Sequence, residues 1–141
     1  DLAVSQSKDN AVYYIQYAHA RVNRMVDVKA PEKGISFDRS KVADYDATLL
    51  VLDAETEILA KLAAYPEIVL RAANSYEPHQ VGNYLKELAA LFHGWYNLDN
   101  TRIIDEQNIA LSQARLLLSI NVQQVLRNGL ELLGVSAPET M

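Results

Sequence analysis

The chain has 141 residues, a length that fits one domain, and half of them are hydrophobic. It contains no cysteine, which excludes a disulfide scaffold and a cysteine nucleophile and fits a reducing compartment. The formal net charge of -5 argues against a nonspecific nucleic-acid binder, which usually carries a basic excess. No apolar run approaches the ~18 residues of a membrane span, so no membrane partner is expected. Because the chain starts at Asp1 within a helical pattern, we expect a fragment of a longer protein.

Apolar residues recur with a helical period along most of the chain and predict an all-α fold, a five-helix bundle forming one domain over residues 1–141. In chain order, the predicted helices cover about residues 8–28, 47–65, 66–75, 78–97 and 105–133. Pro66 and Pro78 suit the first turns of two of them, and Gly134 suits the end of the last. The polar segment 29–47 predicts one long loop. No segment alternates with period two over a useful length, so no sheet is expected.

The helical period also predicts which residues face the core. For the first helix the expected inner residues are Ile15, Ala18, His19, Val22, Met25 and Val26. For the last helix they are Leu111, Ala114, Leu118, Val122, Val125, Gly129 and Leu132. The acidic pairs Asp44/Asp46 and Asp53/Glu55 are expected on solvated faces. Arg115, which apolar residues flank, is expected to pair with an acid such as Asp99 or Glu106.

Sequence motifs for catalysis are missing. The chain has no P-loop, dinucleotide fingerprint, zinc-protease motif, EF-hand loop or glycine-framed serine. Its three histidines, His19, His79 and His93, are scattered, and each is more often a hydrogen-bonded packing residue than a metal ligand. We therefore predict no catalytic residue, no metal site and no cofactor site in this chain.

Aromatic residues provide the one suggestive pattern. Tyr14, Tyr17 and Arg21 are spaced i, i+3, i+7 and would line one shoulder of the first helix. Tyrosine rings can stack on unpaired bases, and arginine can stack or clamp a phosphate. Spacing alone favours the alternative, in which the tyrosines cover a core edge and the arginine reaches solvent. Farther along, Trp95 and Tyr96 are adjacent, so one should face inward while the other is available.

Three segments together resemble a known family. They read "VYYIQYAHAR", "EPHQVGNYLKELAALFHGWYN" and "ARLLLSINVQQVLRNGLELLGVSAPETM". They are similar to the C-terminal, DALR-type anticodon-binding domain of bacterial-type arginyl-tRNA synthetases, and the resemblance covers nearly the whole chain. It implies an all-α domain of an arginine–tRNA ligase, with tRNA(Arg) and the catalytic domain of the same chain as partners. It implies no DNA partner and a cytoplasmic location. ATP with Mg would bind the parent's catalytic domain, whose HIGH-like and KMSKS-like motifs are absent here.

The resemblance also implies which residues contact the anticodon. They are Tyr14, Tyr17, Arg21, Tyr96 and Met141, with Asn97 and Asn100 as neighbours able to bond a base edge. The chain departs from the family where the namesake motif reads "SQAR", so that Arg115 is its only charged match. It departs again at Thr140, where the family usually has arginine, which argues against a phosphate contact there.

Two other functions compete with RNA binding. A helical protein–protein interaction module without RNA contact would need a large exposed apolar patch, whereas partly exposed tyrosines around a concavity would favour RNA. A fragment acting directly in arginine chemistry would need catalytic residues on the first helix. The related domain of cysteinyl-tRNA synthetases shares the expected fold, but the ending at Met141 is of the arginine type.

Overall fold

The structure is a computed structural model that describes residues 2–98 and 102–141, with side chains from residue 11 onward. Its elements are α1 (Leu2–Arg24), the π-helical turn η1 (Met25–Lys29), α2 (Ala30–Glu32), the 3-10 turns η2 (Val42–Asp44) and η3 (Ala47–Leu49), α3 (Asp53–Ala63), α4 (Tyr65–Ser75), α5 (His79–Tyr96) and α6 (Ile109–Leu132). These residues contain no strand. The predicted all-α class and the five longer helices are thus confirmed.

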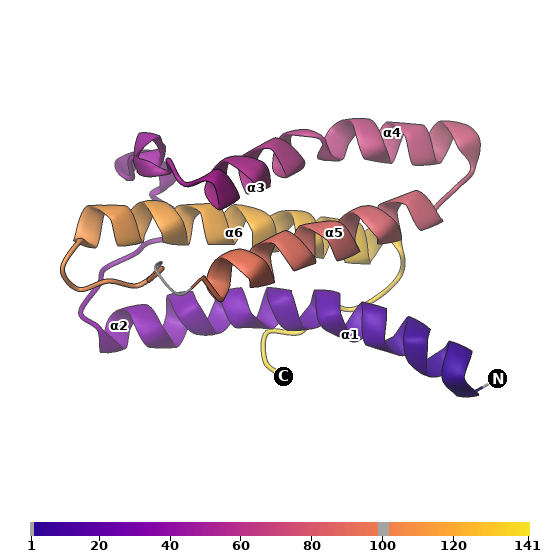
Figure 1. The fold of residues 1–141 in the computed structure, drawn as a ribbon, viewed down its shortest axis with the longest axis horizontal. Helices are drawn as coiled ribbons and strands as arrows, with labels where there is room; N and C mark the ends of the chain where they lie inside the picture. Colours follow the sequence, from indigo (N-terminus) through magenta and orange to yellow (C-terminus); the bar gives the residue numbers. More distant parts are fainter. Residues whose placement is uncertain (1, 99–101) are drawn as a thin grey trace.

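The helices form three layers (Figure 1). The pair α3 and α4 lies on one side, α5 and α6 lie in the middle, and α1 covers the opposite side. Helix α6 packs against α1, α3 and α5, so it is covered from several directions. Leu116, Leu118, Leu126 and Leu130 of α6 are fully buried as a result.

The helical period identified the inner face of the first predicted helix correctly, because all six predicted residues, four in α1 and two in η1, are buried. For α6 the predicted set of core residues was incomplete. Leu132 is 60% exposed in the last turn, whereas Leu116 and Leu126, outside the predicted stripe, have no exposed surface. A single stripe describes a helix with one covered side, and α6 is covered on several.

The first helix continues farther than predicted. Instead of running over 8–28, α1 begins at Leu2, and the helical path passes through η1 and α2 to Glu32. In η1 the Ala30 N–H donates to the carbonyl of Met25, five residues earlier. A proline within an α-helix clashes with the carbonyl four residues before it, and the wider π turn accommodates Pro31.

The long loop is therefore displaced from the predicted segment 29–47. It extends from Lys33 to Leu52, interrupted only by η2 and η3, and α3 begins at Asp53 rather than near residue 47. Asp46 caps only the short turn η3, by accepting a hydrogen bond from Thr48 N at 3.0 Å. Leu50 then follows in an extended conformation and enters the core, 8% exposed.

A buried ion pair joins α3 to α6. Glu55, expected on a solvated face, has no exposed surface. Its Oε2 accepts hydrogen bonds from Arg115 Nε at 2.8 Å and from Trp95 Nε1 at 3.1 Å. The predicted partner Glu106 bonds Lys33 instead, at 3.1 Å, and Asp99 lies outside the described residues. The expectation that Arg115 pairs with an acid was therefore correct, but the partner is Glu55 and not one of the predicted residues.

Among the described residues, none of the helices combines the length and the apolar character needed to cross a membrane. The same part of the chain holds no group of three or more potential ligand side chains placed to bind a metal ion.

Candidate functional site

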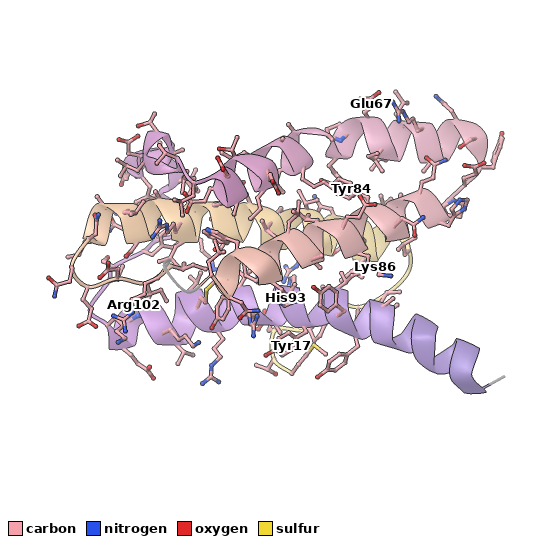
Figure 2. All side chains as sticks on the ribbon, viewed as in Figure 1. Tyr17, Glu67, Tyr84, Lys86, His93 and Arg102 are labelled. Carbon is pink, nitrogen blue, oxygen red and sulfur yellow. The ribbon has the colours of Figure 1, made fainter. Side chains whose placement is uncertain are left out.

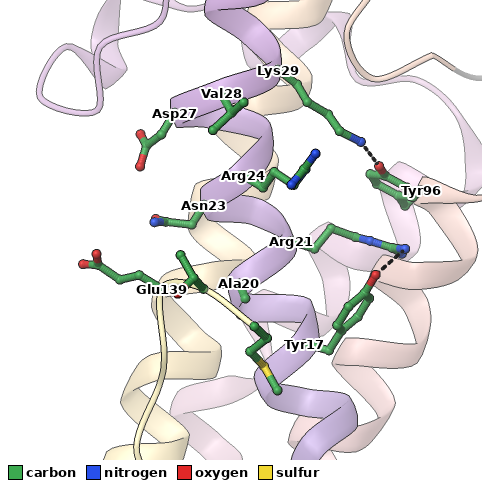
Figure 3. Close-up of a pocket in the computed structure, with 12 residues that line it drawn as sticks. Tyr17, Ala20, Arg21, Asn23, Arg24, Asp27, Val28, Lys29, Tyr96 and Glu139 are labelled. Atoms are coloured by element: carbon green, nitrogen blue, oxygen red, sulfur yellow. Dashed lines mark hydrogen bonds between the residues drawn. The ribbon is translucent and has the colours of Figure 1, made fainter.

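A pocket of about 500 Å³ lies where α1 and η1 meet the end of α5 and the last three residues of the chain (Figure 3). Its lining comprises Tyr17, Ala20, Arg21, Asn23, Arg24, Asp27, Val28, Lys29, Tyr96, Glu139, Thr140 and Met141. We call this the aromatic pocket. Two tyrosines, a methionine and three cations thus surround one concavity.

Arg21 is held between the two tyrosines of the aromatic pocket. Its Nη2 donates to the Tyr17 hydroxyl at 3.3 Å, as the dashed line in Figure 3 marks. The guanidinium carbon lies 4.0 Å from the ring centroid of Tyr96 and 4.8 Å from that of Tyr17, within cation–π range of both. Such contacts fix the guanidinium before any ligand arrives, which reduces the entropy lost on binding.

Lys29 supplies a further cation that the sequence did not suggest. Its Nζ donates to the Tyr96 hydroxyl at 2.6 Å. On an uninterrupted α-helix Lys29 would be turned away from the line through Tyr17 and Arg21, but the π turn η1 changes the angular spacing of residues 25–29. A search of the sequence at 100° per residue could not find this contact.

His93 orients Arg21 from behind. It is 7% exposed, and its Nδ1 accepts a hydrogen bond from Arg21 Nη1 at 2.9 Å. Because an arginine only donates, Nδ1 carries no proton, and Nε2 can donate to the Tyr14 carbonyl at 3.5 Å. Burial lowers the pKa of His93, Arg21 lowers it further, and the Tyr14 carbonyl partly opposes them. The prediction of a hydrogen-bonded packing residue was correct for His93, but it missed the contact with Arg21.

The lowered pKa of His93 predicts that the domain becomes less stable at acidic pH. The unfolded chain binds a proton at His93 with a pKa of about 6.5, whereas the folded pKa is lower. The stabilisation is therefore present above pH ~6.5 and is lost as pH falls through that value toward the folded pKa. We expect the free energy of unfolding, measured with urea at pH 7.5 and 5.5, to fall more in the wild type than in His93→Gln. The control His79→Gln, at an exposed position, should keep the wild-type difference. Equal pH dependence in wild type and His93→Gln would contradict the prediction.

The C-terminal segment returns along α1 and so reaches the aromatic pocket. Gln16 Nε2 donates to the Ser136 carbonyl at 2.9 Å. His19 is fully buried, accepts from Arg127 Nε at 3.4 Å, and donates from Nδ1 to the Pro138 carbonyl at 2.9 Å. Burial lowers the pKa of His19, which favours this neutral form. These bonds place Met141, 52% exposed, in the wall of the pocket.

Comparison with known proteins identifies the family. Residues 15–141 match the model of the DALR anticodon binding domain. The chain belongs to this family. It is 73% identical over its whole length to an arginine–tRNA ligase of Acinetobacter baumannii strain AYE, and 69% identical to that of Acinetobacter baylyi. An arginine–tRNA ligase of Psychrobacter sp. is 52% identical. The chain spans only about a quarter of these relatives, 23% of the first two and 24% of the third.

Solved structures of similar fold support the same family. The arginyl-tRNA synthetase of Thermus thermophilus superposes with a TM-score of 0.71 at 31% identity, over 91% of this chain and 21% of that one. A Campylobacter jejuni protein described as an arginyl-tRNA synthetase gives a TM-score of 0.77 at 25% identity, over 94% of this chain and 27% of that one. The domain is thus an anticodon-binding domain of the arginyl-tRNA synthetase type.

The DALR domain brings together most of the residues that the resemblance suggested. Tyr17, Arg21, Tyr96 and Met141 line the aromatic pocket. Tyr14 lies outside the lining, but its ring packs on His93 at 4.7 Å between centroids. Asn97 is exposed at the end of α5 and does not line the pocket, and Asn100 lies outside the described residues. Trp95 is the inward-facing member of its pair with Tyr96, as expected.

Arg115, which the sequence resemblance assigned to the family's namesake motif, is absent from the lining of the aromatic pocket. It holds the buried carboxylate of Glu55 and donates from Nη1 to the Arg102 carbonyl at 3.0 Å. In this DALR domain its contacts are therefore structural.

Proposed function

We propose that this domain binds the anticodon loop of tRNA(Arg) and that its site is the aromatic pocket. The observation that carries the proposal is the convergence of Tyr17 and Arg21 from α1, Tyr96 from α5 and Met141 from the C-terminal segment on one partly exposed concavity. These side chains come from three separated parts of the sequence, yet they form a single surface with both aromatic and cationic character.

Unpaired bases of an RNA loop are recognised by stacking on aromatic rings or guanidinium planes and by hydrogen bonds to their edges. Tyr17 is 37% exposed and Met141 52%, so each presents apolar surface to a base. Arg21 has five N–H donors, and the described contacts to His93 and Tyr17 use two of them. The remaining donors are available to a base edge or a phosphate, with Lys29 beside them.

In the longer protein, this domain would serve an arginine–tRNA ligase that forms its adenylate from ATP, with Mg, in a catalytic domain of the same chain. The relatives' names supply that activity, and the domain corresponds to about a quarter of their length. We propose no catalytic role for the DALR domain itself and no DNA partner. A cytoplasmic location stays a prediction.

The proposal predicts the effect of removing the stacking ring. In the full-length ligase, Tyr17→Ala and Arg21→Ala should each weaken tRNA(Arg) binding, Tyr17→Ala by about 1–3 kcal/mol because a stacked base loses its platform. Arginine-dependent pyrophosphate exchange should be nearly unchanged, since the adenylate forms elsewhere. The measurements are tRNA affinity, exchange rate and melting temperature on the same preparations.

A matched control removes another exposed tyrosine. Tyr76 is 91% exposed at the end of α4, in a left-handed conformation that asparagine tolerates, so Tyr76→Asn should keep wild-type affinity. Wild-type affinity in both Tyr17→Ala and Arg21→Ala, with a lower melting temperature, would mean that these residues only pack, and would favour the protein-interaction alternative.

A further inference from the structure

A second pocket adjoins the aromatic pocket on the far side of Tyr96. It has a volume of about 430 Å³ and shares Lys29 and Tyr96 with its neighbour. Its lining comprises Met25, Lys29, Glu32, Lys33, Tyr96, Arg102, Ile103 and Ile104. We call this the basic pocket. The hydrogen bond between Lys29 and Tyr96 forms the partition between the two pockets, so one strand crossing that partition would enter both.

Charge is concentrated around these two pockets. Five of the chain's 13 lysines and arginines line one or both of them, but only three of its 18 acidic residues do. The lining of the pockets is therefore net positive on a chain whose formal charge is -5. On an acidic chain, a local excess of cations favours the approach of a phosphate backbone.

The two cations found only in the basic pocket differ in how they are held. Lys33 bonds Glu106, but both side chains are about half exposed, so solvent weakens that ion pair and a phosphate can compete for Lys33. Arg102, labelled in Figure 2, is anchored through its backbone, since its carbonyl accepts from Arg115 Nη1 at 3.0 Å. Arg115 is in turn fixed by the buried Glu55, so the internal ion pair sets the position of the Arg102 backbone at the rim.

The basic pocket also has apolar walls that belong to the core. Met25 and Ile103 in its lining are 1% and 5% exposed, and both belong to the hydrophobic core. The three cations in the lining provide charge for a phosphate, and the apolar residues provide surface for the sugar attached to it.

We propose that the basic pocket binds a phosphate of the RNA strand next to the nucleotide whose base occupies the aromatic pocket, with Lys33 and Arg102 as its ligands and Lys29 shared. This inference rests on the proposed function and adds to it a second subsite and two residues. It also gives the strand a path, from Tyr17 and Arg21 across the Lys29–Tyr96 contact to Arg102.

The test measures binding of a tRNA(Arg) anticodon stem-loop to the full-length ligase between 50 and 200 mM salt. Lys33→Gln and Arg102→Gln should each weaken binding and reduce the salt slope of log K by about 0.7, the value for one lost phosphate contact on a single strand. The charge-matched controls are Lys86→Gln and Arg71→Gln, exposed residues outside both pockets. They should retain the wild-type slope.

Uncharged methylphosphonate linkages in the loop, introduced one at a time, add a second readout. At one position in the loop, the uncharged linkage should weaken binding to the wild-type ligase. The same linkage should not weaken binding to Arg102→Gln any further, because that variant has already lost the contact between Arg102 and this phosphate. Wild-type slopes in Lys33→Gln and Arg102→Gln, together with weak binding by Tyr17→Ala, would overturn the basic pocket and leave the proposed function standing. Normal binding by all three variants would overturn both.

Discussion

Arg115→Ala should lower the free energy of unfolding of the domain by about 3–5 kcal/mol, the usual effect of removing one partner from a buried ion pair. Glu55 is completely buried, and its Oε2 would keep only the Trp95 indole N–H as a donor. The Leu52 N–H, which donates to Oε1 at 3.1 Å, starts α3 and cannot neutralise the charge. The loss therefore exceeds that of an ordinary hydrogen bond, because an unpaired carboxylate remains in the interior.

An exposed ion pair provides the matched control. Arg71 and Glu67 pair at 2.8 Å within α4, with both side chains about two-thirds exposed. Arg71→Ala should change stability by less than about 0.5 kcal/mol, since solvent screens such a pair. Urea unfolding of both variants compares buried and exposed arginines directly. The double variant Glu55→Gln/Arg115→Met should be more stable than Arg115→Ala, because it removes the buried charge. If Arg115→Ala cost no more than Arg71→Ala, the ion pair would have no structural role.

The all-α class and the main helices could be predicted from the sequence because their apolar residues recur with the helical period. Every core residue predicted for the first helix is buried. The period did not predict the π turn, in which the backbone departs from 100° per residue, although Met25 and Val26 at its start are buried as expected. The π turn at Met25–Lys29 extends the first helix and brings Lys29 to Tyr96, and the sequence offers only Pro31 as an indirect sign of it.

Long-range polar pairing was the other gap. Glu55 and Arg115 are 60 positions apart, and nothing local distinguishes Glu55 from the solvated acids around it. The contact between His93 and Arg21 was hidden for the same reason, since it depends on how α1 and α5 pack. The residues Tyr17, Arg21, Tyr96 and Met141 were named from family resemblance, whereas spacing alone favoured simple packing. Their common pocket follows from the fold, in which the C-terminal segment is tied to α1 through His19 and Gln16.

Helices α5 and α6 approach each other closely at Gly129, and Gly129→Ala should be destabilising although alanine is the better helix former. A Cβ at this position would lie 2.5 Å from Leu85 Cδ2, 2.7 Å from Cδ1 and 2.9 Å from Cγ. Because Cγ is among the close atoms, rotation about χ2 of Leu85 cannot relieve all three contacts, and either χ1 of this buried side chain changes or α5 shifts. Overpacking of a core costs about 1–3 kcal/mol. Replacing glycine by alanine within a helix gains about 1 kcal/mol, so the variant loses stability when the overpacking cost lies above the low end of its range.

Gly94 in α5 gives the opposite expectation, because a Cβ there would meet nothing within 4 Å. Gly94→Ala should therefore stabilise the domain by about 0.5–1 kcal/mol through helix propensity alone. Urea unfolding of the two variants should give changes of opposite sign, and changes of the same sign would contradict the close approach of the helices.

Adding Leu85→Ala to Gly129→Ala should cost less than Leu85→Ala does in the wild type, since the new methyl group fills part of the space that the leucine leaves. Because α5 also carries His93 and Tyr96, a shift of this helix in Gly129→Ala should weaken tRNA binding as well, whereas Gly94→Ala should bind normally.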